Sequence, residues 1–231
     1  MAIRIRRLHR WDLSYEDARR VQERLRARVR RRPLALSRVR RVAGADIAIA
    51  GRENRLIAAV VVLAFPSLEV LETRAVISPL TFPYIPGLLS FREVPGLLAC
   101  LETLQTPFDV ILLDGQGIAH PRGLGLASHL GLAIGRPAVG CAKSRLVGEH
   151  RPPGPCRGDH ARLIFEGRYV GSVLRTRDGV NPIYVSPGHL VDHPSSRRLA
   201  LACCSRYRIP EPTRLAHIAA GMHKRRSSGS L

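Results

Sequence analysis

The hydrophobic residues of this chain recur with two different periods within its first eighty positions. Between residues 14 and 32 they return every three to four positions, which predicts an amphipathic helix that Ser14 caps and Pro33 ends. Beyond residue 42 they form three longer apolar segments separated by turn residues, which predicts an antiparallel meander of three strands. These segments are residues 42–49, 56–65 and 70–77.

The rest of the chain alternates between helical periods and short apolar runs. Leu97, Leu98, Leu101 and Leu104 predict a helix that ends before residue 107, with Pro95 near its first turn. Strands are expected at residues 110–113, 138–142, 161–165, 169–174 and 182–186, and helices at residues 124–134, at 195–204 and from 210 onward. The pattern predicts an α/β fold in which helices cover a sheet.

A chain of 231 residues with 45% hydrophobic content can form one domain with its own core. We expect a single domain over residues 1–221, with an N-terminal helix at 14–32 and the core at 42–220. Residues 222–231 are basic, and we expect them to be a disordered tail.

Three acidic residues stand where a carboxylate needs a partner. Asp46 interrupts an apolar strand, Asp114 follows the buried run 110–113, and Glu93 lies on the intervening helix. A buried carboxylate is costly unless it is paired or binds a cation. If the first and fourth strands are neighbours, Asp46 and Asp114 face each other and Glu93 approaches from the helix. Three hard oxygen ligands favour Mg²⁺ or Mn²⁺ over zinc.

Each carboxylate also has a simpler interpretation. Asp46 can mark a bulge or an exposed strand face, and Asp114 can form a turn with the glycine that follows it. Glu93 can complete a capping box with Ser90 at the start of its helix. The residues alone leave these alternatives open.

A stiff loop precedes the helix that carries Glu93. Pro83 and Pro86 fix the backbone on either side of Tyr84 and Ile85, so an aromatic and a β-branched side chain are held outward. The sequence therefore predicts a rigid wedge directly ahead of this helix.

The chain carries 37 Lys and Arg against 18 Asp and Glu, a net charge of +19, which indicates a polyanionic partner. Nucleic acid is favoured over membrane, because no apolar run reaches the length of a membrane span. The N-terminus leads into charged sequence and the five cysteines contain no C-x-x-C pair, so we expect a soluble, reduced, cytoplasmic protein. All but two of the 37 basic residues are arginine, and one exception, Lys143, follows an apolar strand, where a site-specific role and chance both remain open.

With these features in view, the chain resembles the endonuclease V family, nucleic-acid repair enzymes with a ribonuclease H-like fold. The matching segments follow family order over roughly residues 14–220: 42–46, 83–93, 114–117, 120–122, 127–129, 141–144, 185–189 and 211–217. For the fold, the resemblance implies a mixed five-stranded sheet flanked by helices, with an additional hairpin.

For activity, the resemblance implies a metal-dependent endonuclease that cuts DNA, or RNA in some members, near a deaminated purine such as hypoxanthine. The cut falls at the second phosphodiester bond 3′ to the lesion, leaves a 5′-phosphate end and initiates DNA repair. The implied cofactor is Mg²⁺, with Mn²⁺ as a possible substitute, held by Asp46, Glu93 and Asp114. His217 supports the metal site, and Lys143 lies against the scissile phosphate region.

The resemblance also implies which residues bind the nucleic acid. The wedge that parts the strands comprises Pro83, Tyr84, Ile85 and Pro86. The pocket for the flipped base is lined by Gly87, Leu89, Gly125 and Leu126. Candidate DNA contacts are His120, Arg122, Ser186 and Arg214. The expected partner of the monomer is DNA containing deoxyinosine, with RNA as the alternative.

Two other interpretations stay open. One is a ribonuclease that cleaves inosine-containing RNA. The other is a non-catalytic nucleic-acid-binding protein, which predicts salt-sensitive binding without a Mg²⁺-dependent product.

Overall fold

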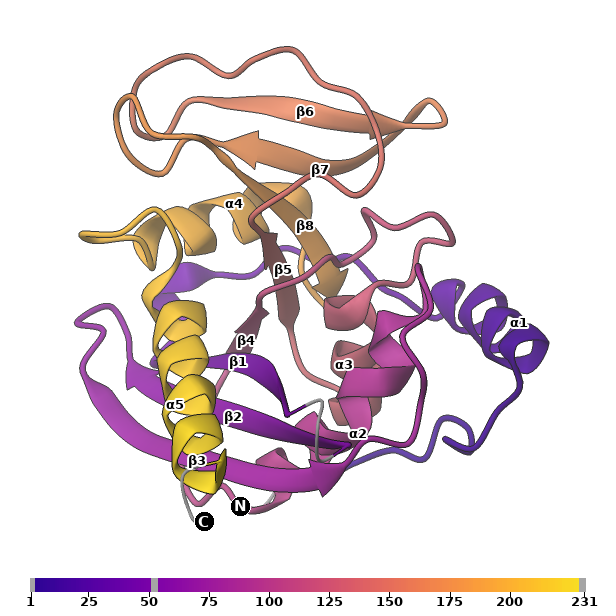
Figure 1. Ribbon diagram of the computed structural model, residues 1–231. Helices are drawn as coiled ribbons and strands as arrows, with labels where there is room; N and C mark the ends of the chain where they lie inside the picture. The colour runs from indigo at the N-terminus through magenta and orange to yellow at the C-terminus, as the bar shows by residue number, and fades with distance from the viewer. Residues whose placement is uncertain (1–2, 51–53, 229–231) are drawn as a thin grey trace.

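A mixed eight-stranded sheet forms the centre of this computed structural model, which describes residues 3–50 and 54–228. The strands lie in the order β3-β2-β1-β4-β5-β8-β7-β6 (Figure 1). They are β1 (Arg41–Ala50), β2 (Arg55–Ala64), β3 (Val70–Pro79), β4 (Val110–Leu113), β5 (Ala138–Ala142), β6 (His160–Phe165), β7 (Arg168–Leu174) and β8 (Ile183–His189). β4 pairs in parallel with both β1 and β5, whereas the remaining neighbours are antiparallel.

Helices cover both faces of this sheet. The four that pack on it are α2 (Leu89–Glu102), α3 (Leu126–Ile134), α4 (His193–Ala202) and α5 (Glu211–Ser228). Successive residues of β4 point to opposite layers: Ile111 joins the core under α2 and α3, and Leu112 joins the core under α4 and α5. None of the helices within residues 3–50 and 54–228 is long and apolar enough to cross a membrane.

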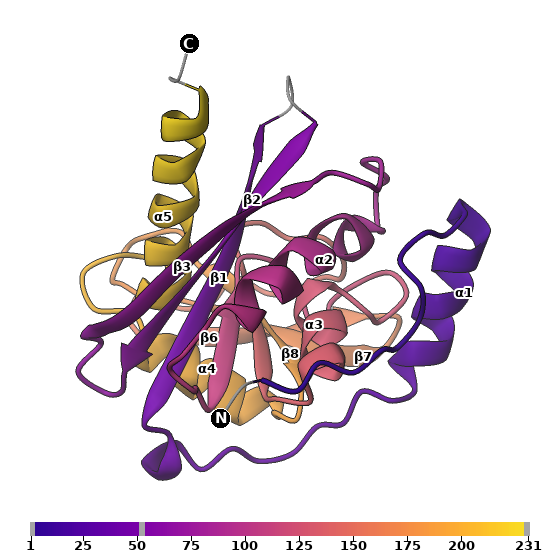
Figure 2. The ribbon, with the colours of Figure 1, turned by 90° about the horizontal axis from the view of Figure 1, so that it is seen from below.

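Helix α1 (Tyr15–Arg26) stands beside the sheet on the side of α2 and α3 (Figure 2). Ser14 caps it by accepting a hydrogen bond from the Asp17 N–H, as predicted. Its buried face packs against Phe82, Leu88 and other residues around the start of α2. A 3-10 turn (Leu36–Arg38) then leads into β1.

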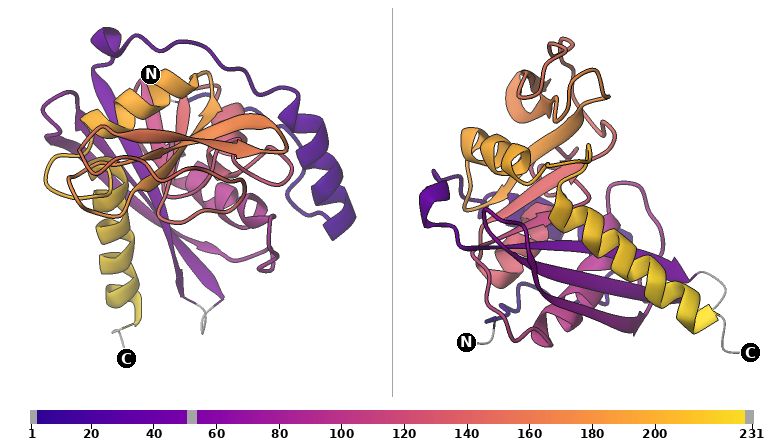
Figure 3. Two further views of the ribbon diagram at one scale, coloured as in Figure 1. Left: turned by 90° about the horizontal axis from the view of Figure 1, so that it is seen from above. Right: turned by 90° about the vertical axis from the view of Figure 1, so that its left-hand side faces the viewer.

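The α/β class, the meander of β1 to β3 and the strand at 138–142 confirm the predictions. The expected count of five strands was wrong, because the hairpin of β6 and β7 continues the same sheet through β8 and forms the end opposite β3 (Figure 3). The helix expected at 14–32 ends at Arg26. Arg30 instead exchanges hydrogen bonds with His189 and the Leu190 N–H, so the chain follows the end of β8.

Two further predictions about helices need correction. Residues 222–228 are not disordered, because α5 continues to Ser228; the rest of the expected tail, 229–231, lies outside the described residues. Pro95 lies well inside α2, since the helix already begins at Leu89. Ser90 is therefore a helical residue and no cap, which removes the capping box as an explanation for Glu93.

Candidate active site

Asp46 and Asp114 occupy corresponding positions on two adjacent parallel strands. The register pairs Ala45 of β1 with Leu113 of β4, so the next residue along each segment is one of these aspartates. Burial raises the pKa of Asp46, and the negative charge of Asp114 raises it as well. The sheet thus brings together two carboxylates that are far apart in the sequence.

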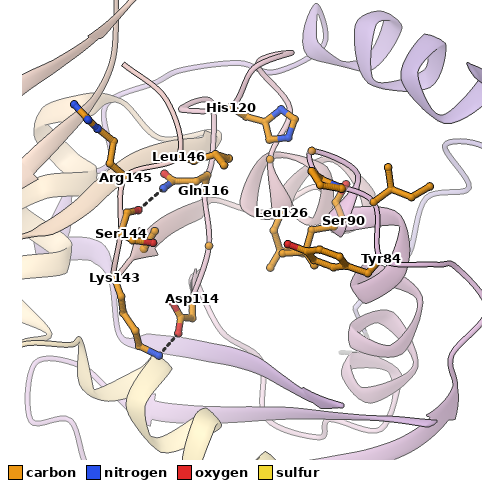
Figure 4. Close-up of a pocket in the computed structure, with 17 residues that line it drawn as sticks. Tyr84, Ser90, Asp114, Gln116, His120, Leu126, Lys143, Ser144, Arg145 and Leu146 are labelled. Carbon is orange, nitrogen blue, oxygen red and sulfur yellow. Dashed lines mark hydrogen bonds and ion pairs between the residues drawn. The ribbon is translucent and has the colours of Figure 1, made fainter. Parts of the chain in front are cut away.

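Each aspartate has a basic partner. The Lys143 ammonium, at the end of β5, forms an ion pair with the Asp114 carboxylate (Figure 4). The His217 ring on α5 lies 2.7 Å from the Asp46 carboxylate, measured from Nδ1 to Oδ2. Lys143 and His217, two residues singled out in the sequence, therefore meet the aspartates predicted to be metal ligands.

A glycine on β1 allows α5 to come this close. A Cβ on Gly44 would lie 2.0 Å from the Pro212 carbonyl carbon, so only glycine fits beneath the start of α5. Gly44 and Asp46 are two positions apart and point to the same face of β1. The close approach at Gly44 consequently places the next turns of α5, with His217, over Asp46.

Glu93 approaches from α2, which covers the opposite face. Burial, together with the negative charges of Asp46 and Asp114, raises the pKa of its carboxyl group to about 8, against the lowering effect of Arg92. Both aspartates thus act on Glu93, so the three carboxylates share one region of negative potential.

The donor set fits a hard divalent cation. Carboxylate oxygens are the ligands that Mg²⁺ and Mn²⁺ prefer, and such an ion would relieve the repulsion that raises the pKa values of Asp46 and Glu93. In the parts of the chain that the structure describes, no group of three His, Cys, Asp or Glu side chains is placed so that it could hold a metal ion as it stands. Asp46 and Asp114 are instead engaged with His217 and Lys143.

A cavity of about 380 Å³ opens next to Asp114. It is lined by three of the four wedge residues and by all four residues of the predicted base pocket: Tyr84, Ile85, Pro86, Gly87, Leu89, Gly125 and Leu126. Asp114 and Lys143 also line it, so the cavity is continuous with the Asp114 side of the carboxylate region (Figure 4).

The wedge loop is held from below by polar side chains. The Gly87 carbonyl oxygen accepts hydrogen bonds from Gln22 Nε2, at 2.9 Å, and from Arg122 Nη2, at 2.6 Å. Gly87 has φ of +77°, and a Cβ there would lie 2.7 Å from the Arg122 guanidinium. Tyr84 in contrast is 68% exposed. The loop therefore has a fixed base and an exposed aromatic tip, whose ring the Arg92 guanidinium approaches to 5.9 Å.

The four candidate DNA contacts all have partners inside the protein. Arg122 is held under the wedge loop as described above. His120 accepts a hydrogen bond from the Arg122 backbone N–H, and burial lowers its pKa to about 4, so the ring is neutral and carries its proton on Nε2. Ser186 is buried and accepts from the Gly117 N–H at 2.7 Å. Arg214 pairs with Glu211.

Several residues of the site were missed in the sequence. Gln22 is fully buried on the apolar face of α1, and a polar residue within that face was the available signal. Gln116 lines the cavity and donates to the Ser144 carbonyl at 3.2 Å. Residues 144–146 also line the cavity; residue 144 ends one of the matching segments, whereas no sequence pattern marks 145 and 146. Ser90, interpreted as a cap, is another lining residue.

The raised pKa of Glu93 predicts a pH-dependent stability that a Gln substitution removes. Because the pKa rises from 4.5 to about 8 on folding, the stabilisation is fully present below pH 4.5 and is lost as the pH rises through 8. Gln resembles the protonated form. In EDTA at pH 8.5, Glu93→Gln is therefore expected to unfold at a higher temperature than the wild type. The increase should be about 2 to 4 °C for each kcal/mol by which the buried charge destabilises the wild type. Equal melting temperatures at that pH would contradict the raised pKa, and at pH 4 the two proteins should coincide.

Comparison with known proteins assigns the family. The family model for endonuclease V matches residues 23–218. Endonuclease V from Trichormus variabilis is 48% identical over 208 residues, which cover 90% of this chain and 94% of that protein. The crystal structure of endonuclease V from Streptomyces avermitilis has a TM-score of 0.90 and 39% identity, covering 99% of this chain and all of that one. Endonuclease V from Ciona intestinalis, solved with a 24mer DNA containing an inosine followed by a ribo-adenosine, has a TM-score of 0.81 and 25% identity over 92% of this chain and 98% of that one.

The fold is thus ribonuclease H-like, and the molecule is of the nuclease class. Within that class, the chain belongs to the endonuclease V family.

Proposed function

We propose that this chain is a metal-dependent endonuclease that recognises hypoxanthine in DNA and hydrolyses the second phosphodiester bond on its 3′ side. The products carry a 3′-hydroxyl and a 5′-phosphate, and the cut initiates repair. The pairing of Asp46 with Asp114 on adjacent strands, beside a cavity that the wedge loop closes, is the observation that carries this proposal. Family membership and the inosine-containing DNA bound by the Ciona relative support it.

Asp46, Glu93 and Asp114 would hold Mg²⁺, for which Mn²⁺ can substitute. A bound ion supplies a water of lowered pKa and compensates the charge that develops on the phosphate. Lys143, which pairs with Asp114 in this structure, would add a second positive charge there when Asp114 binds the ion instead. His217 orients Asp46 through their hydrogen bond.

The wedge and the cavity have separate roles in recognition. A base can be read inside a pocket only after it leaves the stack, which costs a few kcal/mol. Tyr84, exposed on a loop with a fixed base, fills the gap and offsets part of that cost. Hypoxanthine differs from adenine in its C6 oxygen and its N1 hydrogen, so hydrogen-bonding groups in the cavity are sufficient to distinguish them.

Replacement of Tyr84 by alanine should impair duplex cleavage selectively. We expect a loss of about tenfold in kcat/KM on an inosine-containing duplex, because the flipped state loses its support, and a much smaller loss on the same single strand. Tyr15→Ala, which removes another exposed tyrosine from α1, serves as the matched control and should leave both rates unchanged. Equal losses on duplex and single strand would contradict a wedge role.

The nucleic acid itself is tested by direct comparison. The assay compares three inosine-containing substrates at one salt concentration: duplex DNA, single-stranded DNA and single-stranded RNA. We expect one of the two DNA substrates to be cleaved fastest. Preference for RNA would redirect the proposal to an inosine-specific ribonuclease. Salt-sensitive binding without any Mg²⁺-dependent product would show a binding protein. Monomeric state and cytoplasmic location stay predictions.

A further inference from the structure

A chain of hydrogen bonds connects the N-terminal segment to the wall of the cavity. His9 Nε2 lies 2.8 Å from His129 Nε2, and His129 Nδ1 lies 2.9 Å from Ser90 Oγ. At the other end, His9 Nδ1 lies 2.5 Å from the Arg10 carbonyl oxygen. Ser90 lines the cavity, on the same side as Tyr84 in Figure 4. None of these three side chains has a role in the arrangement of Asp46, Glu93 and Asp114 described above.

The surroundings keep both imidazole rings in place and neutral. His9 packs against Trp11, with ring centroids 4.3 Å apart, and His129 is fully buried in contact with Phe91. Burial lowers the pKa of His9 and lowers that of His129 to about 3. Each ring therefore has one nitrogen that donates and one that accepts.

The Arg10 carbonyl then fixes the direction of every hydrogen in the chain. A carbonyl oxygen only accepts, so His9 Nδ1 donates to it and His9 Nε2 is an acceptor. His129 Nε2 must donate to His9, which leaves His129 Nδ1 as an acceptor. The Ser90 hydroxyl therefore donates its one hydrogen to His129. The opposite direction would set an unprotonated His9 nitrogen against the carbonyl oxygen.

We propose that Ser90 is a specificity-determining residue whose hydroxyl oxygen acts toward the cavity as a hydrogen-bond acceptor, with His129 and His9 as the positioning residues that impose this polarity. The inference rests on the proposed function and deepens it. The N1–H of hypoxanthine is a donor and matches this acceptor. The N1 of adenine carries a lone pair, which an acceptor in a buried pocket repels.

Base analogues separate this role from a structural one. Cleavage is measured under single-turnover conditions on strands with hypoxanthine or with unsubstituted purine, whose N1 carries a lone pair. Ser90→Ala is expected to reduce cleavage at hypoxanthine by about tenfold and to leave cleavage at purine unchanged or faster, so the preference collapses. Equal loss on both substrates, or no loss on either, overturns the proposal.

Substitutions in the N-terminal segment test the relay itself. His9→Phe keeps an aromatic ring beside Trp11 but removes the acceptor for His129 Nε2, so the His129 tautomer and the direction of the Ser90 hydrogen bond are no longer fixed. The preference for hypoxanthine should therefore fall, as it does for Ser90→Ala. Trp11→Phe keeps an aromatic ring against His9 and His129 and removes no hydrogen bond of the relay, so it should keep the wild-type preference. An unchanged preference in His9→Phe, or an equal fall in Trp11→Phe, overturns the relay. A wild-type protein that ignores hypoxanthine would instead refute the proposed function, and thermal unfolding confirms that each variant is folded.

Discussion

Asp114→Asn is expected to cleave an inosine-containing strand about 10³-fold more slowly than the wild type, which corresponds to several kcal/mol of lost transition-state stabilisation. Asn keeps the shape of the side chain but removes the negative charge that holds the cation and pairs with Lys143. The cavity wall is otherwise preserved, so binding of the strand should change only slightly. Single-turnover cleavage and fluorescence anisotropy with the same oligonucleotide measure the two effects separately.

Glu102→Gln is the matched control for the loss of one carboxylate. Glu102 is exposed at the end of α2, away from the cavity-lining residues, and its replacement changes the net charge by the same amount. Full activity is expected. If Asp114→Asn cleaves as fast as the wild type, Asp114 is not a metal ligand.

Among the substitutions considered, Gly44→Ala is expected to lower the free energy of unfolding most, although it adds a single methyl group. Its Cβ would lie 2.0 Å from the Pro212 backbone, where no flexible side chain can move aside. Overpacking of this kind costs about 1–3 kcal/mol or more, and relief requires α5 to shift away from β1. His217 would move with α5, so activity should fall together with the free energy of unfolding measured by urea titration.

Gly221, which lies on α5 itself, provides the comparison. A Cβ on Gly221 meets nothing closer than the tip of Arg225, at 4.0 Å, so Gly221→Ala adds a methyl group to α5 without a clash. Alanine favours a helix interior by about 0.5–1 kcal/mol relative to glycine, so the variant should be as stable as the wild type or more stable. Equal destabilisation by both substitutions would contradict the close packing at Gly44.

The sequence was informative where the physical signal is local. The short apolar runs at 110–113 and 138–142 are strands with those bounds, because a segment buried on both faces has little choice of register. Asp46 was conspicuous as a single carboxylate in an apolar strand. The prediction that Asp114 lies beside it rested on the assumption that the first and fourth strands pair, which the structure confirms.

The remaining features depend on contacts between distant segments. The strands of the hairpin were expected to extend the sheet, but the order in which β8, β7 and β6 join it is set by contacts between distant segments, and the last helix owes its length partly to packing on β1 and β2. Ser90 had the spacing of a cap, yet its hydroxyl bonds to a histidine from α3. Together with His9, this pairing joins three residues that are remote in the sequence, and no periodicity in the chain predicts it.

The most direct test of the central proposal is a product map on a labelled duplex with a single deoxyinosine, beside an identical duplex without it, in the presence and absence of Mg²⁺. The expected result is one product, cut at the second phosphodiester bond 3′ to the inosine, formed only when both the inosine and the ion are present. Equal cutting of the plain duplex, or the same product in excess EDTA, would contradict a lesion-specific site built on Asp46, Glu93 and Asp114.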